Sequence, residues 1–322
     1  MATSVPVVTE AVKSKNLVRR LLGGDEIAFA ITWTFAASIL LLTAMLVWQL
    51  WFKSTAARDK FGFNFFSTSV WDPPGEKFGA LPFIYGTILT SFLALLIAVP
   101  LGVGAAIFLS EMAPRRISNI ATFLVELLAA VPSVIYGLLA IFTLIPLLRA
   151  YGEPFLQSTL GFLPFFSGPM YGVSFLAAGL ILAIMTFPFI ISISREALMD
   201  VPRDQREAAL ALGATKWEAT WQAVVPYARL GIMGSVFLGL ARALGETMAV
   251  TMVIGNTPTV SASLFSPGST IAAAIANEFT EATGDVYLAS LIFLGLVLFL
   301  LTIVINGLAR ILIIATTKKG SS

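Results

Sequence analysis

Apolar residues follow one another in long blocks along this chain, and short polar segments separate the blocks. A helix needs about 20 mainly apolar residues to cross the hydrocarbon core of a bilayer. Six blocks are long enough: Ile27–Phe52, Phe83–Leu109, Asn119–Leu148, Tyr171–Ser194, Leu230–Gly255 and Val286–Ile314. The pattern therefore predicts an all-α, polytopic membrane protein with six transmembrane helices.

Four prolines lie inside these blocks: Pro100, Pro132, Pro146 and Pro188. A proline removes one backbone hydrogen bond and crowds the preceding turn, but neighbouring helices in a membrane bundle can satisfy the groups that it frees. We therefore expect each of these prolines to kink its helix rather than to break it.

The composition excludes several classes of protein. Hydrophobic residues make up 57% of the 322 residues and charged residues 12%, whereas soluble domains are about 45–50% apolar and about 25% charged. The chain has no cysteine and no histidine, which excludes disulfides, thiolate metal sites and histidine-based catalysis. The net charge of +2 gives no argument for nucleic-acid binding.

Lysine and arginine are unevenly distributed between the two sides of the predicted spans. If the N-terminus is cytoplasmic, fourteen of the 20 basic residues fall in inner segments and five in outer loops, and Arg242 lies within a span. Cytoplasmic loops carry an excess of positive charge. Both termini are therefore predicted to be cytoplasmic.

The prediction divides the chain into a cytoplasmic segment (1–26), a six-span domain (27–314) and a cytoplasmic tail (315–322). Residues 13–22 mix basic and apolar side chains. That mixture fits either a helix on the inner membrane surface or a solvated tail, and both interpretations stay open.

Residues 195–226 form the longest predicted inner loop. Pro202 suits the first turn of a helix, an Ala-, Leu- and Glu-rich run follows it, and Gly213 suits a C-terminal cap. A second short helix is expected from Thr215 to near Pro226. Two short helices joined at a glycine can dock into a groove on a partner protein.

The loop also contains Glu207-Ala208-Ala209, then Gly213 after three residues, then Pro226. This spacing resembles the EAA motif of ABC importer permeases, although Ala223-Val224-Val225 replaces the Ile-x-Leu-like tail before the proline. The alternative is a plain helical connector. The resemblance implies that five residues couple the chain to an ATPase: Glu207, Ala208, Ala209, Gly213 and Pro226.

Four further stretches resemble the C-type permease subunit of bacterial phosphate ABC importers, the Pst system: Ala80–Pro100, Glu126–Gly137, Gly239–Thr257 and Thr270–Phe279. The resemblance implies the type I ABC importer permease architecture in a bacterial cytoplasmic (inner) membrane. It implies no cofactor. The partners that it implies are a second related permease subunit, a cytoplasmic ATPase dimer and an external phosphate-binding protein, besides phosphate and membrane lipid.

An ATPase of this kind would need a Walker A loop, G-x-x-x-x-G-K-[ST], to hold the nucleotide phosphates. No Gly-Lys pair occurs in the sequence. We therefore expect a partner subunit to hydrolyse ATP, and this chain to be a transporter subunit rather than an enzyme.

Three ionisable residues lie well inside predicted spans: Glu126, Arg242 and Glu246. Such residues usually face a cavity or a partner, and Arg242 and Glu246 are expected one helical turn apart. They form either a structural ion pair or a phosphate contact, in which the planar guanidinium matches phosphate oxygens and Glu246 holds it between transport events. The resemblance favours the second alternative, because the matching Arg and Glu of the family's RALGET stretch are implicated in transport.

Weaker path candidates are Ser133, which follows a proline, Thr247, which follows Glu246, and Glu126. A local hydrogen bond is the simpler expectation for Ser133. Glu126 lies nearer the cytoplasmic end of its block, which favours an interfacial carboxylate or a bond to a neighbouring helix. Glu278 and Glu281 either pair with a protein that docks outside or are ordinary loop charges.

The predicted function is that of a permease subunit in an ATP-driven phosphate importer. One rival is an ABC permease for another solute, such as sulfate, molybdate or an amino acid, because the EAA motif alone does not separate these. The other rival is a proton-coupled carrier that uses Glu126 or Glu246 as a relay, although such a carrier would not need the 195–226 loop.

Overall fold

The computed structural model describes residues 25–318, and the side chains of residues 26–311. The chain separates into two compact units, Met1–Lys53 and Ser54–Ser322. Helix α2 (Asp25–Lys53) is the described part of the first unit, and it is apolar along nearly its whole length. The predicted segment 13–22 and residues 319–322 of the predicted tail lie outside the described residues.

Six helices in the described part are long and apolar enough to cross a membrane, which confirms the predicted class of fold. They begin at Glu26, Leu81, Ser133, Phe175, Lys216 and Asp285. The helix that begins at Asp285, α16, continues to Lys318 and so enters the predicted tail. Two short strands, β1 (Trp71–Asp72) and β2 (Lys77–Phe78), form an antiparallel hairpin outside these helices.

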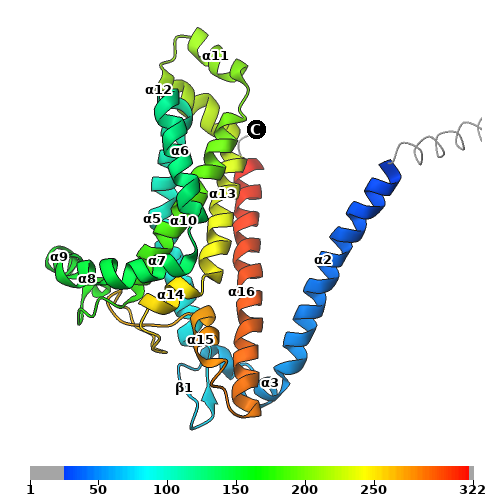
Figure 1. The fold of residues 1–322 in the computed structure, drawn as a ribbon, viewed down its shortest axis with the longest axis vertical. Helices are drawn as coiled ribbons and strands as arrows, with labels where there is room; N and C mark the ends of the chain where they lie inside the picture. Colours follow the sequence, from blue (N-terminus) through cyan, green and yellow to red (C-terminus); the bar gives the residue numbers. More distant parts are fainter. Residues whose placement is uncertain (1–24, 319–322) are drawn as a thin grey trace, which may run out of the picture. The chain divides into compact units, whose positions relative to one another are not determined.

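Helix α10 (Phe175–Met199) lies at the centre of the second unit, between α5 (Leu81–Ile107) and α13 (Val225–Gly245) (Figure 1). Membrane helices pack closely where small residues meet. A Cβ atom on Gly179 would lie 2.8 Å from the Leu93 side chain, and one on Gly102 would lie 2.8 Å from Ile190. These glycines let α5 and α10 approach each other closely.

The prediction of one continuous span over Asn119–Leu148 is wrong. Helix α6 (Arg115–Ala130) ends before Pro132, and Val131 has an extended backbone with ψ 128°. The residue before a proline is pushed out of the helical region by the proline ring, so Pro132 breaks the helix rather than kinking it. Pro100 and Pro188 do lie inside continuous helices, as expected.

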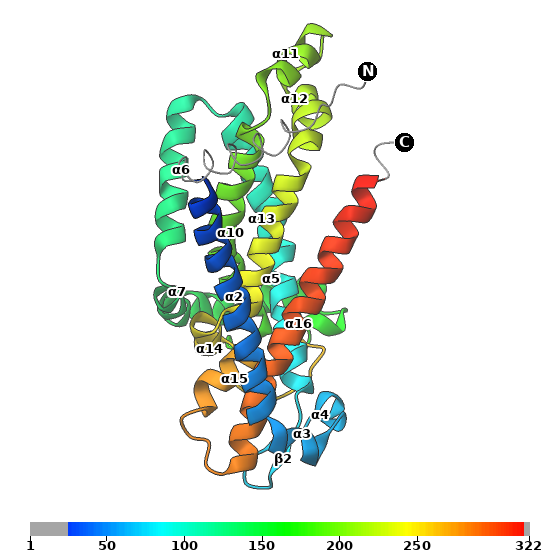
Figure 2. The same cartoon turned by 90° about the vertical axis from the view of Figure 1, so that its right-hand side faces the viewer.

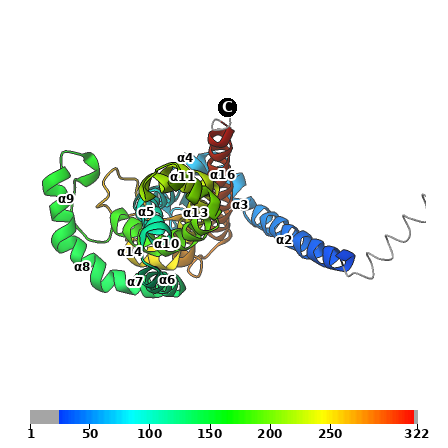
Figure 3. The ribbon, with the colours of Figure 1, turned by 90° about the horizontal axis from the view of Figure 1, so that it is seen from above.

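After the break a second apolar helix runs from residue 133 to 160. It comprises α7 (Ser133–Leu139), η2 (Ala140–Leu144), α8 (Ile145–Leu147), η3 (Leu148–Gly152) and α9 (Glu153–Leu160). It runs across the direction of α5 and α10 in Figures 1 and 2, and Figure 3 shows α8 and α9 outside the group of α5, α10 and α13. The carboxylate of Glu153, which is fully buried, ties it to the start of α10 by accepting from Gly172 N at 3.2 Å.

Wide π-helical turns precede four prolines in the described chain. The turns η1 (Phe108–Met112), η2, η3 and η5 (Thr220–Val224) each end two residues before a proline: Pro114, Pro146, Pro154 and Pro226. A proline has no N–H and its ring collides with the carbonyl four residues earlier. A π turn shifts that carbonyl, and three of the four helices therefore continue through the proline.

The fifth apolar helix differs from its predicted bounds at both ends. The expected second loop helix begins at Lys216 with α12 (Lys216–Ala219), but it passes through Pro226 into α13 without ending. At the other end α13 stops at Gly245, because Glu246 is extended with ψ 127°. A separate short helix, α14 (Met248–Val253), follows. Leu230–Gly255 is therefore not one span.

An apolar cluster lies at the end of the second unit that is opposite residues 203–215 (Figure 1). It joins α3 (Thr55–Phe61), α4 (Asn64–Ser67), α15 (Ile271–Glu278) and α16, and the rings of Phe65 and Phe293 stack at 4.4 Å. Glu278 accepts hydrogen bonds from Trp71 Nε1 and the Tyr287 hydroxyl, both at 2.7 Å. Glu278 thus holds the hairpin to α16, and of the two carboxylates only Glu281 is exposed.

Candidate functional site

The break at the end of α13 carries three of the predicted path residues: Arg242, Glu246 and Thr247. Helix α13 is positioned against α10 by close contacts, since a Cβ on Gly239 would lie 2.9 Å from Thr186. The hydroxyls of Ser194 and Ser235 also hydrogen-bond across the two helices at 2.7 Å. Arg242 therefore projects from a helix that is fixed along its length and interrupted one turn later.

The Arg242 guanidinium has an aromatic neighbour and no acceptor in the described chain. Its central carbon lies 4.2 Å from the centre of the Phe189 ring on α10. Its Nε is buried without a hydrogen-bond partner among the described residues. Stacking on an aromatic face stabilises a cation without using its donors, so the donor edge of Arg242 stays available to an anion.

The expected ion pair between Arg242 and Glu246 does not form in this conformation. No contact within 4 Å joins their charged atoms, and Glu246 instead accepts from Ala249 N at 3.4 Å, at the start of α14. The helix ends between the two residues, so the one-turn spacing that would pair them is lost. Thr247 donates from its hydroxyl to Gly245 O at 3.3 Å.

Ser133 begins the helix that follows the other break. The helices after the two breaks pack on each other, because a Cβ on Gly137 of α7 would lie 3.2 Å from Ala249 Cα of α14. Ser133 is half-buried, and its hydroxyl has no hydrogen-bond partner within residues 26–311. Glu126 is set apart from this group, exposed on α6 without a partner in the same range.

Discontinuous helices that meet inside a membrane domain are typical of transporter binding sites. Here the two interruptions, at 131–132 and 246–247, bring Ser133 toward the segment that carries Glu246 and Thr247. Arg242 supplies the positive charge at the C-terminal end of α13, where the helix dipole favours a cation. The arrangement can hold an anion weakly, with one guanidinium, hydroxyl donors and a nearby carboxylate.

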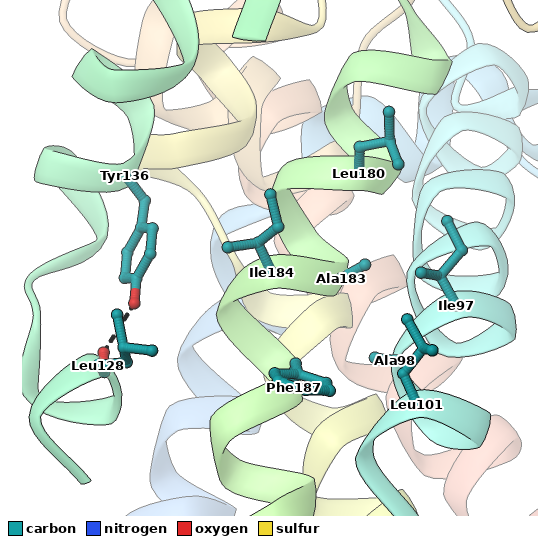
Figure 4. A pocket seen from close by; sticks show the side chains of 9 residues that line it. All are labelled: Ile97, Ala98, Leu101, Leu128, Tyr136, Leu180, Ala183, Ile184 and Phe187. Atoms are coloured by element: carbon teal, nitrogen blue, oxygen red, sulfur yellow. Dashed lines mark hydrogen bonds between the residues drawn. The ribbon is translucent and has the colours of Figure 1, made fainter. Parts of the chain in front are cut away.

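A cavity of about 380 Å³ lies between α6, α7, α5 and α10 (Figure 4). It is lined by Ile97, Ala98, Leu101, Leu128, Tyr136, Leu180, Ala183, Ile184 and Phe187. The one hydroxyl among them belongs to Tyr136 and is bonded to Leu128 O at 2.8 Å. This lining offers no free polar group, so the cavity does not suit a phosphate ion.

The predicted coupling segment contains α11 (Arg203–Ala211), which projects from one end of the second unit (Figure 1). Glu207 and Ala208 are exposed on it, and Ala209 is half-buried. Gly213 follows with φ +90°, and its N–H bonds to Leu210 O at 3.0 Å, as expected for a glycine C-cap. A helix that is capped and exposed in this way can dock as a rigid unit.

A capping box fixes the start of the next helix, α12. Glu218 accepts from Thr215 N at 2.8 Å, and Thr215 Oγ1 accepts from Glu218 N at 3.3 Å. This reciprocal pair satisfies two N–H groups at the helix start. Because α12 continues into α13, a displacement of this corner reaches the Arg242 region through one continuous helix.

The ion pair between Arg206 and Glu111, beside the predicted coupling segment, was not predicted from the sequence. Arg206 donates to both carboxylate oxygens of Glu111, from Nε at 3.1 Å and from Nη2 at 2.8 Å. The two residues are 95 positions apart, and Glu111 lies in a π turn that the hydropathy pattern does not reveal. The one available signal was a basic residue directly before Glu207 in a short amphipathic helix.

Residues 98–316 match the family described as "Binding-protein-dependent transport system inner membrane component". The matched region begins within α5 and contains α10, α11, α13 and most of α16. The fold and the interrupted helices agree with that description, so the class is a multi-pass inner-membrane component of a binding-protein-dependent transport system.

Within this class of transport components, the chain is similar in sequence to permease proteins of phosphate transport systems. The chain is 47% identical over 314 residues to "Phosphate transport system permease protein PstC" of Mesorhizobium japonicum, covering 96% of each protein. It is 46% identical to the protein of the same name in Pasteurella multocida (88% of this chain, 90% of the relative), and 37% identical to a probable PstC of Methanocaldococcus jannaschii (91% and 93%). The chain belongs to this family of transport system permease proteins.

A solved structure shares the fold. A chain from the crystal structure of a bacterial ABC transporter that imports the acidic polysaccharide alginate aligns with a TM-score of 0.56 and 18% identity, covering 92% of this chain and 98% of that chain. At this identity the likeness concerns the fold alone, and it agrees with the predicted ABC importer permease architecture.

Proposed function

We propose that this chain is the permease subunit of an ATP-driven phosphate importer, in which Arg242 contacts phosphate in transit. The similarity to phosphate transport permeases supports the substrate. The single structural observation behind the role of Arg242 is its buried Nε without a partner, beside an interrupted helix. A guanidinium presents paired donors that match phosphate oxygens.

The affinity of this contact for phosphate is low, because a tightly bound ion would not be released along the path. Glu246 lies four residues after Arg242 and repels a second negative charge. Ser133 offers a hydroxyl donor that is free in the described chain, and Thr247 offers one when it gives up its bond to Gly245 O. Glu126, exposed on α6, belongs to a surface that faces lipid or a partner and not to the anion contact. A second, related permease subunit completes the path.

ATP is hydrolysed by a cytoplasmic ATPase dimer that docks on α11 through Glu207, Ala208 and Ala209, with Gly213 and Pro226 shaping the segment. The sequence holds no Gly-Lys pair for a Walker A loop of its own. Both termini face the cytoplasm, and an external phosphate-binding protein delivers phosphate at the opposite end. ATP binding and hydrolysis shift the population between outward-facing and inward-facing states.

The substitution Arg242→Gln tests the proposed contact. It should lower phosphate uptake by the reconstituted complex on the order of 10- to 100-fold, the effect of losing one charge-assisted hydrogen bond. Uptake of radiolabelled phosphate into proteoliposomes measures the effect, and co-purification of the other subunits measures assembly. Arg310→Gln, on an exposed position of α16, is the matched control and should leave uptake unchanged.

Two results would contradict this proposal. If Arg242→Gln prevents assembly, Arg242 has a structural role. If ATP hydrolysis is stimulated by a sulfate-loaded or amino-acid-loaded binding protein and not by a phosphate-loaded one, the chain serves another solute.

A further inference from the structure

The contacts of Arg206 connect the coupling helix to two spans at once. Besides Glu111, its guanidinium donates to the backbone oxygens of Leu198, at 2.7 Å, and Val201. Glu111 lies in η1, the turn that extends α5, and Leu198 lies in the last turn of α10. One side chain of α11 therefore bonds to the ends of both α5 and α10.

The Arg206–Glu111 pair is largely shielded from water. The side chains are 23% and 11% exposed, whereas Lys60–Glu76, the other ion pair in the described chain, is 40% and 58% exposed. Bidentate pairs between arginine and a carboxylate are stronger and more directional than single contacts. Screening by solvent is also weaker for a sheltered pair.

An apolar cluster beneath the pair stiffens the connection. Ala106 and Ile107 of α5, Leu198 and Val201 at the end of α10, and Val224 and Ala228 at the start of α13 are packed together. A cavity of about 200 Å³ lies between η1, α11 and the α12–η5 segment and is lined by Glu111, Arg206, Leu210, Lys216, Ala219, Thr220 and Val224. Arg206 and Glu111 both line it, and their ion pair joins α11 to η1.

We propose that Arg206 and Glu111 are positioning residues that transmit displacement of the docked α11 to α5 and α10. This inference rests on the proposed docking of an ATPase on α11. Without the pair, α11 loses its bidentate bond to η1 and keeps its contacts with α12 and η5. ATP hydrolysis would then continue, but a smaller part of the displacement of α11 would be transmitted to α5 and α10.

The test is the number of phosphates imported per ATP hydrolysed, measured with the whole complex in proteoliposomes. For Arg206→Gln and for Glu111→Gln we expect this ratio to fall about tenfold, within the range of ordinary coupling between sites, while the ATPase still co-purifies. The double variant Arg206→Glu with Glu111→Arg restores opposite charges and should recover part of the ratio. Lys60→Gln, in the exposed ion pair, is the matched control and should not change it.

An unchanged ratio in Glu111→Gln overturns the proposal, and this variant lies outside α11, so it remains informative if Arg206→Gln assembles poorly. Loss of the ATPase from Arg206→Gln alone also overturns it, because Arg206 would then act in docking. Failure of the proposed phosphate function is distinguishable, because the unsubstituted complex would then import almost no phosphate per ATP, whereas failure of this inference leaves the ratio of the unsubstituted complex intact and equal to that of Glu111→Gln.

Discussion

At the scale of single residues, glycines allow the helices of this protein to approach each other closely, and two arginines have contrasting surroundings. Gly86 of α5 faces the backbone oxygen of Ser269 so closely that a Cβ atom has no room there. Gly104, on the same helix, has no atom within 4 Å of that position. Glycine is therefore required at one of these positions and not at the other.

We expect Gly86→Ala to destabilise the protein by about 1–3 kcal/mol, the usual cost of overpacking. Gly104→Ala should be neutral or slightly stabilising, because alanine favours a helix more than glycine does. The apparent melting temperature in detergent compares the two variants directly. Equal melting temperatures would contradict the close packing of α5 on the Ser269 segment.

The two arginines that matter most differ in what surrounds them. Arg206 has its donors filled by a carboxylate and two carbonyls, whereas Arg242 has an aromatic face and an unpaired Nε. A saturated guanidinium holds structure together, and an unsaturated one is suited to a ligand. This contrast is the physical basis for giving them different roles.

At the scale of elements, the π turns and the helix breaks decide how the apolar blocks are used. A π turn before Pro226 lets α12 continue into α13, so the coupling corner and the Arg242 site share one helix. The breaks at 131–132 and 246–247 have no π turn before them. These interruptions free backbone groups within the membrane domain that a continuous helix would pair internally.

The coupling element gives a prediction of its own. Glu207→Lys should weaken association of the ATPase or its coupling, because Glu207 is exposed on α11 and belongs to the proposed docking face. Gln205→Lys places a lysine on the opposite side of α11, with a charge change of +1 against +2, and should have a much smaller effect, since residues two apart do not share a face. Co-purification of the ATPase and phosphate-dependent ATP hydrolysis measure both variants.

If the two lysine variants behave alike, the effect is one of net charge and the docking face is wrongly assigned. If neither changes transport, α11 is a plain connector.

At the scale of the whole molecule, the coupling helix and the hairpin lie at opposite ends of the second unit (Figure 1). An importer needs this separation, since ATP is hydrolysed on one side of the membrane and the solute arrives on the other. The positive charges of the predicted inner segments favour the orientation that places α11 in the cytoplasm.

Orientation can be measured because the chain contains no cysteine. A single cysteine at the exposed Gln205 should react with a membrane-impermeant maleimide only when the cytoplasmic face is accessible. A single cysteine at the exposed Thr280 should react from the outside of intact cells. The opposite pattern would reverse the proposed topology, and labelling of both positions from outside would contradict the spans between them.

The sequence was sufficient to predict those features that depend only on residues close together along the chain. Blocks of apolar residues must be helical to satisfy their backbone in lipid, which gave the all-α class and the approximate positions of four of the six spans. The Gly213 cap and the start of α11 depend on backbone preferences of a few neighbouring residues, and both are confirmed. The family was also evident from the EAA-like spacing and the stretches around Arg242.

Sequence alone determined that this protein is a helical membrane permease with a helical element between its fourth and fifth blocks and a lone arginine in its fifth block. Tertiary structure decided that Pro132 breaks its helix, that α13 stops before Glu246, and that Arg206 reaches Glu111. The reason is physical: apolarity and local propensity act over one or two turns. The neighbours that the fold brings together decide whether a helix continues past a proline and which charged side chains form ion pairs.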